Sequence, residues 1–151
     1  MKTELAIPSD LKFLAVVEDW LLNSLKAELG NIVDMDWKKV ESRLRLVIVE
    51  VYSNIVRHAH QDRPEIPVIL RLGVEGSFLC LEVWDQGHGF DIRNYRAPDP
   101  SEHQEGGYGW LILHQLMDRV DYQLMVGEGR NCLTLEKDLG FIRDYAQSPK
   151  A

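Results

Sequence analysis

Three short groups of residues in this 151-residue chain have the types and spacing that nucleotide chemistry needs. Glu50 and Asn54 lie four residues apart in a helix-like segment. A D-x-G-x-G sequence occupies positions 85–89 after a strand-like segment, and a G-G-x-G sequence occupies positions 106–109 before another helix-like segment. Carboxylates polarise hydroxyls, amide oxygens bind Mg²⁺, and backbone N–H groups at glycines bind phosphate. Because the chain contains no Gly-Lys-Ser or Gly-Lys-Thr ending of a P-loop, these groups predict an ATP site of another kind.

The first group lies along the edge of an apolar helix face. Glu50, Asn54 and His58 follow an i, i+4, i+8 spacing, which places them in one row on a helix. This row is either an ordinary helix edge with a satisfied asparagine, or a carboxylate that polarises a hydroxyl one turn from a Mg²⁺-binding amide. Zinc binding by His58 and His60 is not expected, because positions two residues apart do not converge on a helix.

The two glycine groups also have alternative interpretations. Asp85 and its glycines could form a simple turn, or the carboxylate could accept a hydrogen bond from an exocyclic amine such as that of adenine while the glycines let the backbone approach the base. The glycines at 106–109 could be a flexible hinge, or a phosphate cradle in which uncovered N–H groups and the helix dipole attract an anion. Each group alone is a weak signal.

The composition excludes several classes of protein. A formal net charge of -7 and a pI near 5.2 argue against a nucleic-acid surface. The N-terminus has no apolar signal region, and the apolar runs are too short to span a membrane. Cys80 and Cys132 lie in strand-like segments without a CxxC spacing, so a disulfide requires those strands to be neighbours. We therefore expect a cytoplasmic protein in which both thiols are buried and reduced.

Hydrophobic periodicity predicts a single α+β domain over residues 1–151. Ser9 is expected to cap the first helix, and the polar loop at 90–107 is expected to act as a lid. The fold class is a two-layer sandwich of a mixed, mostly antiparallel sheet with helices on one face. The predicted strands are 3–7, 66–73, 78–84, 120–126 and 131–136, and the predicted helices are 10–29, 36–59 and 108–117.

Residues 40–137 resemble the GHKL ATPase superfamily, which includes gyrase, histidine kinases and related chaperones and has the Bergerat ATP-binding fold. The sequences EVYSNIVRHAH, WDQGHGFDI and GGYGWLILHQLMDRVDY are most similar to those of the small anti-sigma factor serine kinases. The N box of those kinases, E-x-x-x-N-x-x-x-H-A, is matched position for position by Glu50, Asn54, His58 and Ala59.

The resemblance implies a role for each matched residue. Glu50 would be the general base or would orient the hydroxyl, and Asn54 would bind Mg²⁺. Asp85 would bind adenine, and Thr134 resembles the threonine that supports this aspartate. The implied ATP-binding positions are Asn54, His58, Asp85, Gly87, Gly89, Gly106, Gly107, Gly109 and Thr134.

The function implied by the resemblance is that of a Mg·ATP-dependent serine/threonine protein kinase. It would phosphorylate an anti-anti-sigma (STAS) protein, hold a sigma factor or similar regulator in a partner-switching system, and form a homodimer, without binding nucleic acid or membrane. The alternative is an ATP-binding sensor that sequesters a partner without phosphoryl transfer. A degenerate domain that binds no nucleotide is the third hypothesis.

Overall fold

The computed structural model describes residues 1–87, 109–126 and 129–140, so the predicted lid at 90–107 lies outside the described residues. The strands are β1 (Lys2–Pro8), β2 (Pro67–Glu75), β3 (Phe78–Asp85), β4 (Arg119–Val126) and β5 (Arg130–Asp138). The helices are η1 (Leu11–Phe13), α1 (Leu14–Leu29), α2 (Trp37–Asn54), η2 (Ile55–Ala59) and α3 (Gly109–Leu116). None of the described helices combines the length and the apolar character that a membrane span requires.

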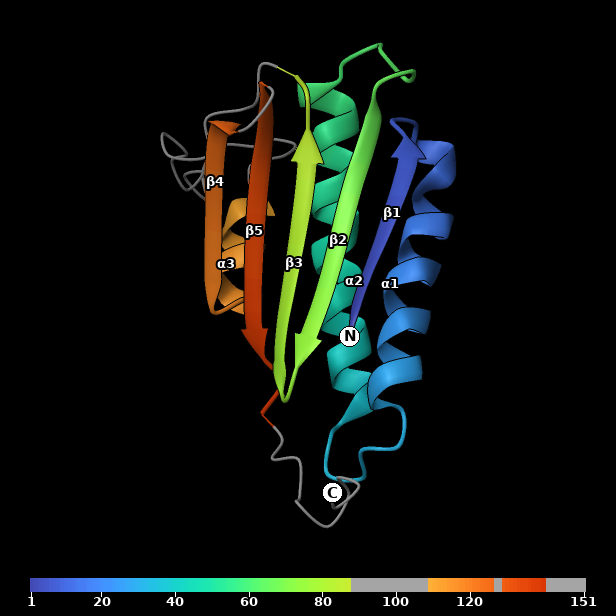
Figure 1. Cartoon of the computed structure of the whole chain (residues 1–151), viewed down its shortest axis with the longest axis vertical. Coiled ribbons are helices and arrows are strands. Elements are labelled where there is room, and N and C mark those ends of the chain that lie inside the picture. The colour runs from blue at the N-terminus through green and yellow to red at the C-terminus, as the bar shows by residue number, and fades with distance from the viewer. Residues whose placement is uncertain (88–108, 127–128, 141–151) are drawn as a thin grey trace, which may run out of the picture.

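The strands form one sheet in the order β1-β2-β3-β5-β4, and every pairing among the described strands is antiparallel. Figure 1 shows α1, α2 and α3 behind this sheet, on the same face. The α+β sandwich expected from the sequence is therefore confirmed, with antiparallel rather than mixed pairing in the described part.

The core lies between the sheet and the helices. Alternate residues of β2 and β3 are buried, as expected for strands that have one face against helices. From the helical layer, α1 contributes Val17, Leu21, Leu25 and Leu29, and α2 contributes Leu44, Val47, Ile48 and Val51. These positions recur every three or four residues, so each helix buries one continuous apolar stripe.

The residue that caps the helix after β1 differs from the one expected from the sequence. Asp10, and not Ser9, caps η1, since its side chain accepts a hydrogen bond from the Lys12 N–H. Ser9 is buried, and its own N–H donates to the Pro64 carbonyl. The fully buried Tyr52 holds this connection against α2 because its hydroxyl accepts from the Asp10 N–H and lies within hydrogen-bond distance of the Pro8 carbonyl.

The second helix changes its winding where the N box lies. The α-helical hydrogen bonds of α2 end at Asn54, and η2 continues the same helix as a π-helical turn. The His60 N–H closes this turn on the Ile55 carbonyl at 2.8 Å. Single π turns within α-helices are frequent at functional sites. The predicted helix 36–59 is therefore present, with a wider last turn that sequence periodicity does not reveal.

The two cysteines lie on neighbouring strands, β3 and β5, but at different levels of the ladder. Cys80 pairs with Glu136, whereas Cys132 pairs with Trp84. This offset of four residues is roughly 13 Å along a strand, which is too far for a disulfide. Both thiols are free, and burial raises the pKa of Cys132 to about 11.

A glycine joins the end of the sheet to the end of the N-box helix. Immediately after β3, Gly87 packs directly on the Ala59 carbonyl of η2, and a Cβ atom at position 87 would overlap that oxygen. The contact is between two backbones, so no side-chain rotation can relieve the overlap. Glycine is therefore required here for packing, whatever the loop binds.

Gly87→Ala should lower the free energy of unfolding by at least about 2 kcal/mol, because the backbone of η2 or of the loop must move. Gly73→Ala in β2 is a matched control, since the nearest atom to its new Cβ is the Met1 carbonyl oxygen at 3.9 Å. The control should change stability by no more than about 0.5 kcal/mol. Urea denaturation measures both variants, and equal stabilities would contradict the packing role of Gly87.

Candidate nucleotide-binding site

Asp85 ends the row of β3 side chains that face the helices. Leu79, Leu81 and Val83 precede it at intervals of two residues and are fully buried. Asp85 continues this row and is 1% exposed. A carboxylate in such a position must be hydrogen-bonded, because an unpaired buried charge is costly.

Three donors from different segments meet the Asp85 carboxylate. Asn131 Nδ2 donates to Oδ1 at 2.7 Å, and the Gly87 N–H donates to the same oxygen at 3.1 Å. The Tyr122 hydroxyl donates to Oδ2 at 2.7 Å. An ionised carboxylate can accept about four hydrogen bonds. Within the described residues, Asp85 is thus fixed in orientation while one acceptor position on Oδ2 is left for a further donor, such as an exocyclic amine.

The expected support of Asp85 by Thr134 needs correction. Thr134 pairs with Glu82 in the β3–β5 ladder, three residues before Asp85, so its side chain lies on the opposite face of the sheet. Its hydroxyl lies 3.7 Å from Cys132 Sγ on that face. Asn131, which pairs directly with Asp85, supplies the support instead.

The role of Asn131 could not be predicted from the sequence because it depends on the register of β5 against β3. Its side chain also donates to the Gly87 carbonyl at 2.9 Å and accepts from the Met125 N–H at 3.1 Å. It therefore connects the loop after β3 with the end of β4. The available signal was its position two residues before the buried Leu133, in the same inward-facing row.

His60 is a second buried polar residue at this end of the core. It is 1% exposed, and its Nε2 accepts a hydrogen bond from the Gln86 N–H at 2.8 Å. The acceptor role requires that Nε2 carries no proton. Burial lowers the pKa of His60 below its usual value of 6.5, against the opposing effect of the nearby Asp85 carboxylate. The neutral imidazole thus holds the D-x-G loop through its hydrogen bond with the Gln86 N–H.

Glu50 and Asn54 lie on the α2 surface that faces α3. Asn54 Nδ2 donates to Glu50 Oε1 at 3.2 Å, so both side chains are oriented and both are half-buried. Gly109, the first residue of α3, lies against the same carboxylate, and a Cβ atom there would overlap Glu50 Oε1. The structure therefore brings the N box into contact with the last glycine of the 106–109 group.

The remaining predicted site residues fall into two classes. His58 is exposed on the π turn, four residues after Asn54, and takes no part in the hydrogen bond between Glu50 and Asn54. Gly89, Gly106 and Gly107 lie outside the described residues. The structure thus brings together Glu50, Asn54 and Gly109 on the helices, and Asp85 and Gly87 at the end of the sheet.

These residues fit Mg·ATP by the chemistry of their donors. With Nδ2 of Asn54 engaged by Glu50, its amide oxygen is available to a hard cation, and Mg²⁺ in nucleotide sites usually takes one or two protein oxygens plus phosphates and water. The first N–H groups of α3 have no intrahelical acceptors and can bind phosphate. No cluster of three or more His, Cys, Asp or Glu that could hold a metal occurs in the described residues.

Comparison with known proteins agrees with this arrangement. The model of the histidine kinase-like ATPase domain matches residues 8–137, which extend from before η1 to the penultimate residue of β5. The chain belongs to this family. The resemblance that the three sequence groups indicate is thereby confirmed.

Serine-protein kinase RsbW of Bacillus cereus (strain AH820) is 30% identical over 141 residues, which cover 87% of this chain and 82% of the relative. RsbW of Bacillus anthracis has the same identity and coverage. Among solved structures, the RsbU and RsbW domains of Rv1364c from Mycobacterium tuberculosis match with a TM-score of 0.59 and 16% identity. That match covers 91% of this chain and 32% of the longer chain, and it supports the fold.

Asn131→Ala should weaken the binding of ADP by roughly tenfold or more, because Asp85 loses a charge-assisted hydrogen bond and its fixed orientation. Thr134→Ala is the matched control in the same strand and should leave the affinity unchanged. Isothermal titration calorimetry measures both. Tyr122→Phe, which removes the hydroxyl that donates to Oδ2, keeps the test valid if Asn131→Ala unfolds. Equal loss in the Thr134 variant would return the supporting role to Thr134.

Stability should fall as the pH decreases from 7.5 to 5.5. In the unfolded chain His60 has its usual pKa of about 6.5, whereas in the folded chain its pKa is lower. The unfolded chain therefore binds more protons in this pH range, and acid favours unfolding by up to about 1 kcal/mol. Urea denaturation at both pH values measures the difference. His60→Gln should reduce it, whereas His58→Gln, the exposed control, should retain it. An unchanged pH dependence in His60→Gln would exclude this residue as its source.

Proposed function

We propose that the chain is a Mg·ATP-dependent serine/threonine protein kinase that acts as an anti-sigma regulator. In this proposal it phosphorylates a hydroxyl of an anti-anti-sigma (STAS) protein and holds a sigma factor or similar regulator when that partner is modified. The contact of Glu50 with Asn54 and with the first residue of α3 is the observation that carries the proposal. It puts a carboxylate, an amide oxygen and a helix N-terminus within one small volume.

The residues have separate tasks in phosphoryl transfer, which depends mainly on positioning and charge neutralisation. The Asp85 carboxylate accepts a hydrogen bond from the exocyclic amine of adenine. Asn54 binds Mg²⁺ through its amide oxygen. Glu50 takes the proton of the attacking hydroxyl. When bound, Mg·ATP supplies the γ-phosphoryl group, which passes to that hydroxyl oxygen as its bond to the β-phosphate breaks and ADP leaves. The N–H groups at the start of α3 hold the phosphates as charge develops.

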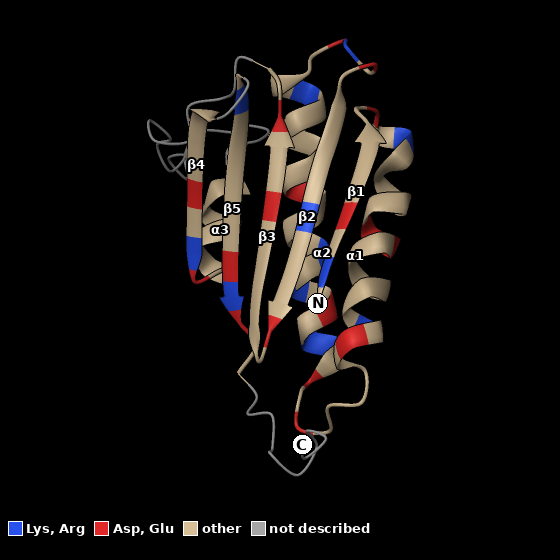
Figure 2. Cartoon of the chain, viewed as in Figure 1, with Lys and Arg blue, Asp and Glu red and all other residues tan. Residues whose placement is uncertain are grey.

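Two further observations favour a protein partner. The RsbW relatives from Bacillus are serine-protein kinases, which act on protein hydroxyls. Figure 2 shows Lys and Arg interspersed with Asp and Glu along the strands and helices, which agrees with the formal net charge of -7 and disfavours a nucleic-acid partner. The proposal includes a homodimer, on the strength of the family resemblance, and a cytoplasmic location, because sigma factors work there.

Glu50→Gln should bind Mg·ATP nearly as the wild type does but lose phosphoryl transfer by about 10²–10⁴-fold, because the amide cannot take the hydroxyl proton. Asn54→Ala should lose both Mg²⁺-dependent ATP binding and transfer, since it removes the proposed metal ligand. Labelled ATP with a panel of purified STAS proteins measures transfer, and calorimetry measures binding.

Glu41→Gln is the matched control, because it makes the same change on α2 at a carboxylate that pairs with Arg45. It should leave binding and transfer unchanged. Transfer by Glu50→Gln at the wild-type rate would exclude Glu50 as the base. ATP binding without transfer to any STAS protein, in the wild type as well, would favour the non-catalytic sensor.

A further inference from the structure

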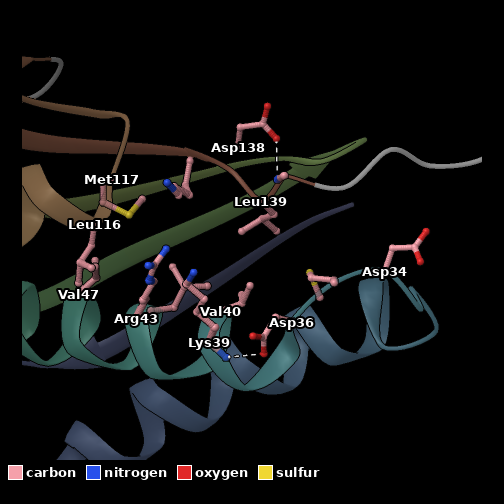
Figure 3. A pocket seen from close by; sticks show the side chains of 14 residues that line it. Asp34, Asp36, Lys39, Val40, Arg43, Val47, Leu116, Met117, Asp138 and Leu139 are labelled. Atoms are coloured by element: carbon pink, nitrogen blue, oxygen red, sulfur yellow. Dashed lines mark hydrogen bonds between the residues drawn. The ribbon is translucent and has the colours of Figure 1, made fainter.

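A cavity of about 330 Å³ lies at the opposite end of α2 from the candidate nucleotide site. It opens between the first turns of α2, the end of α3 and the end of β5, as Figure 3 shows. Its volume is at the lower end of the range of small-molecule sites. The apolar lining residues are Met35, Val40, Leu44, Val47, Leu116, Met117 and Leu139. None of them is assigned to nucleotide binding, so the cavity needs its own explanation.

The acidic residues at the rim are turned away or already engaged. The Asp36 side chain accepts from the Lys39 N–H at 3.2 Å and caps α2. Asp138 accepts from the Ser77 hydroxyl at 2.8 Å and from the Gly140 N–H at 3.0 Å. In Figure 3, Asp34 and Asp138 point away from the space between α2 and the end of β5. Each of the three aspartates keeps its negative charge, but Asp36 and Asp138 are held by hydrogen bonds within the chain, and Asp34 and Asp138 are directed away from this space.

Two cations face the cavity from one helix. Lys39 and Arg43 are four residues apart on α2, and Arg43 points into the space between α2 and the end of β5 (Figure 3). Like charges at this spacing repel each other. Within the described residues neither side chain has an ion-pair partner, in contrast to Lys137 across the cavity, which lies 3.3 Å from Asp118. An anion between Lys39 and Arg43 would relieve the repulsion.

We propose that this cavity is a second ligand site, which takes a small organic anion with one acidic head and an apolar body. The head lies between Lys39 and Arg43. The body packs on Val40, Leu44 and Leu116, which form part of the apolar lining. Charge at the rim and an apolar interior together select this class over a purely polar ion or a neutral hydrocarbon.

The probe for this site is 8-anilinonaphthalene-1-sulfonate, which combines an acidic head with an aromatic body and fluoresces in apolar surroundings. Titration of the folded full chain, without nucleotide, should show saturable binding. The double variant Lys39→Gln/Arg43→Gln should bind the probe roughly tenfold more weakly, which corresponds to the loss of charge-assisted contacts. Val40→Phe should also reduce binding, because the ring fills part of the cavity.

Lys38→Gln is the control for loss of positive charge on α2, since it removes one such charge from an exposed position that does not line the cavity. It should bind the probe like the wild type. Urea denaturation verifies that each variant is folded. The proposal is overturned by any of three results: no saturable binding in the wild type, equal weakening in Lys38→Gln, or displacement of the probe by saturating ADP with unchanged binding in the double variant.

Discussion

The buried carboxylate of Asp85 organises one end of the molecule. A charge that is 1% exposed is tolerated only when donors replace the water that it has lost. Here the donors come from β5, β4 and the loop after β3, through Asn131, Tyr122 and Gly87. Each hydrogen bond ties the segment that carries the donor to the end of β3, in addition to the backbone pairing of the sheet. The same hydrogen bonds fix the orientation of the carboxylate that we propose binds adenine.

Two glycines bring the helices to this organised end. Gly87 lets the loop touch the Ala59 carbonyl, and Gly109 lets α3 begin against Glu50. From the sequence alone, both glycines are expected to contact a ligand. In the structure a Cβ atom at either position would overlap another part of the chain, so packing alone requires glycine at both positions. A nucleotide site without a P-loop depends on such contacts, because its parts come from distant segments.

The elements were predictable because their signals are local, whereas much of the site's support was not. Period-two burial in β2 and β3 and the helical stripes of α1 and α2 follow directly from the sequence. The choice between Thr134 and Asn131 depends on the register of β5 against β3, which no local pattern contains. The burial of His60 depends on the π turn, which widens the helix after Asn54 without changing its hydrophobic pattern.

The helix α2 links the two ends of the molecule. Arg43 and Asn54 are eleven residues apart, or roughly 16 Å along the helix. A ligand in the cavity would touch Leu116 and Met117, at the end of the helix that begins with Gly109 against Glu50. The cavity and the contact between Glu50 and Gly109 are therefore both formed between α2 and α3 or directly beyond their ends.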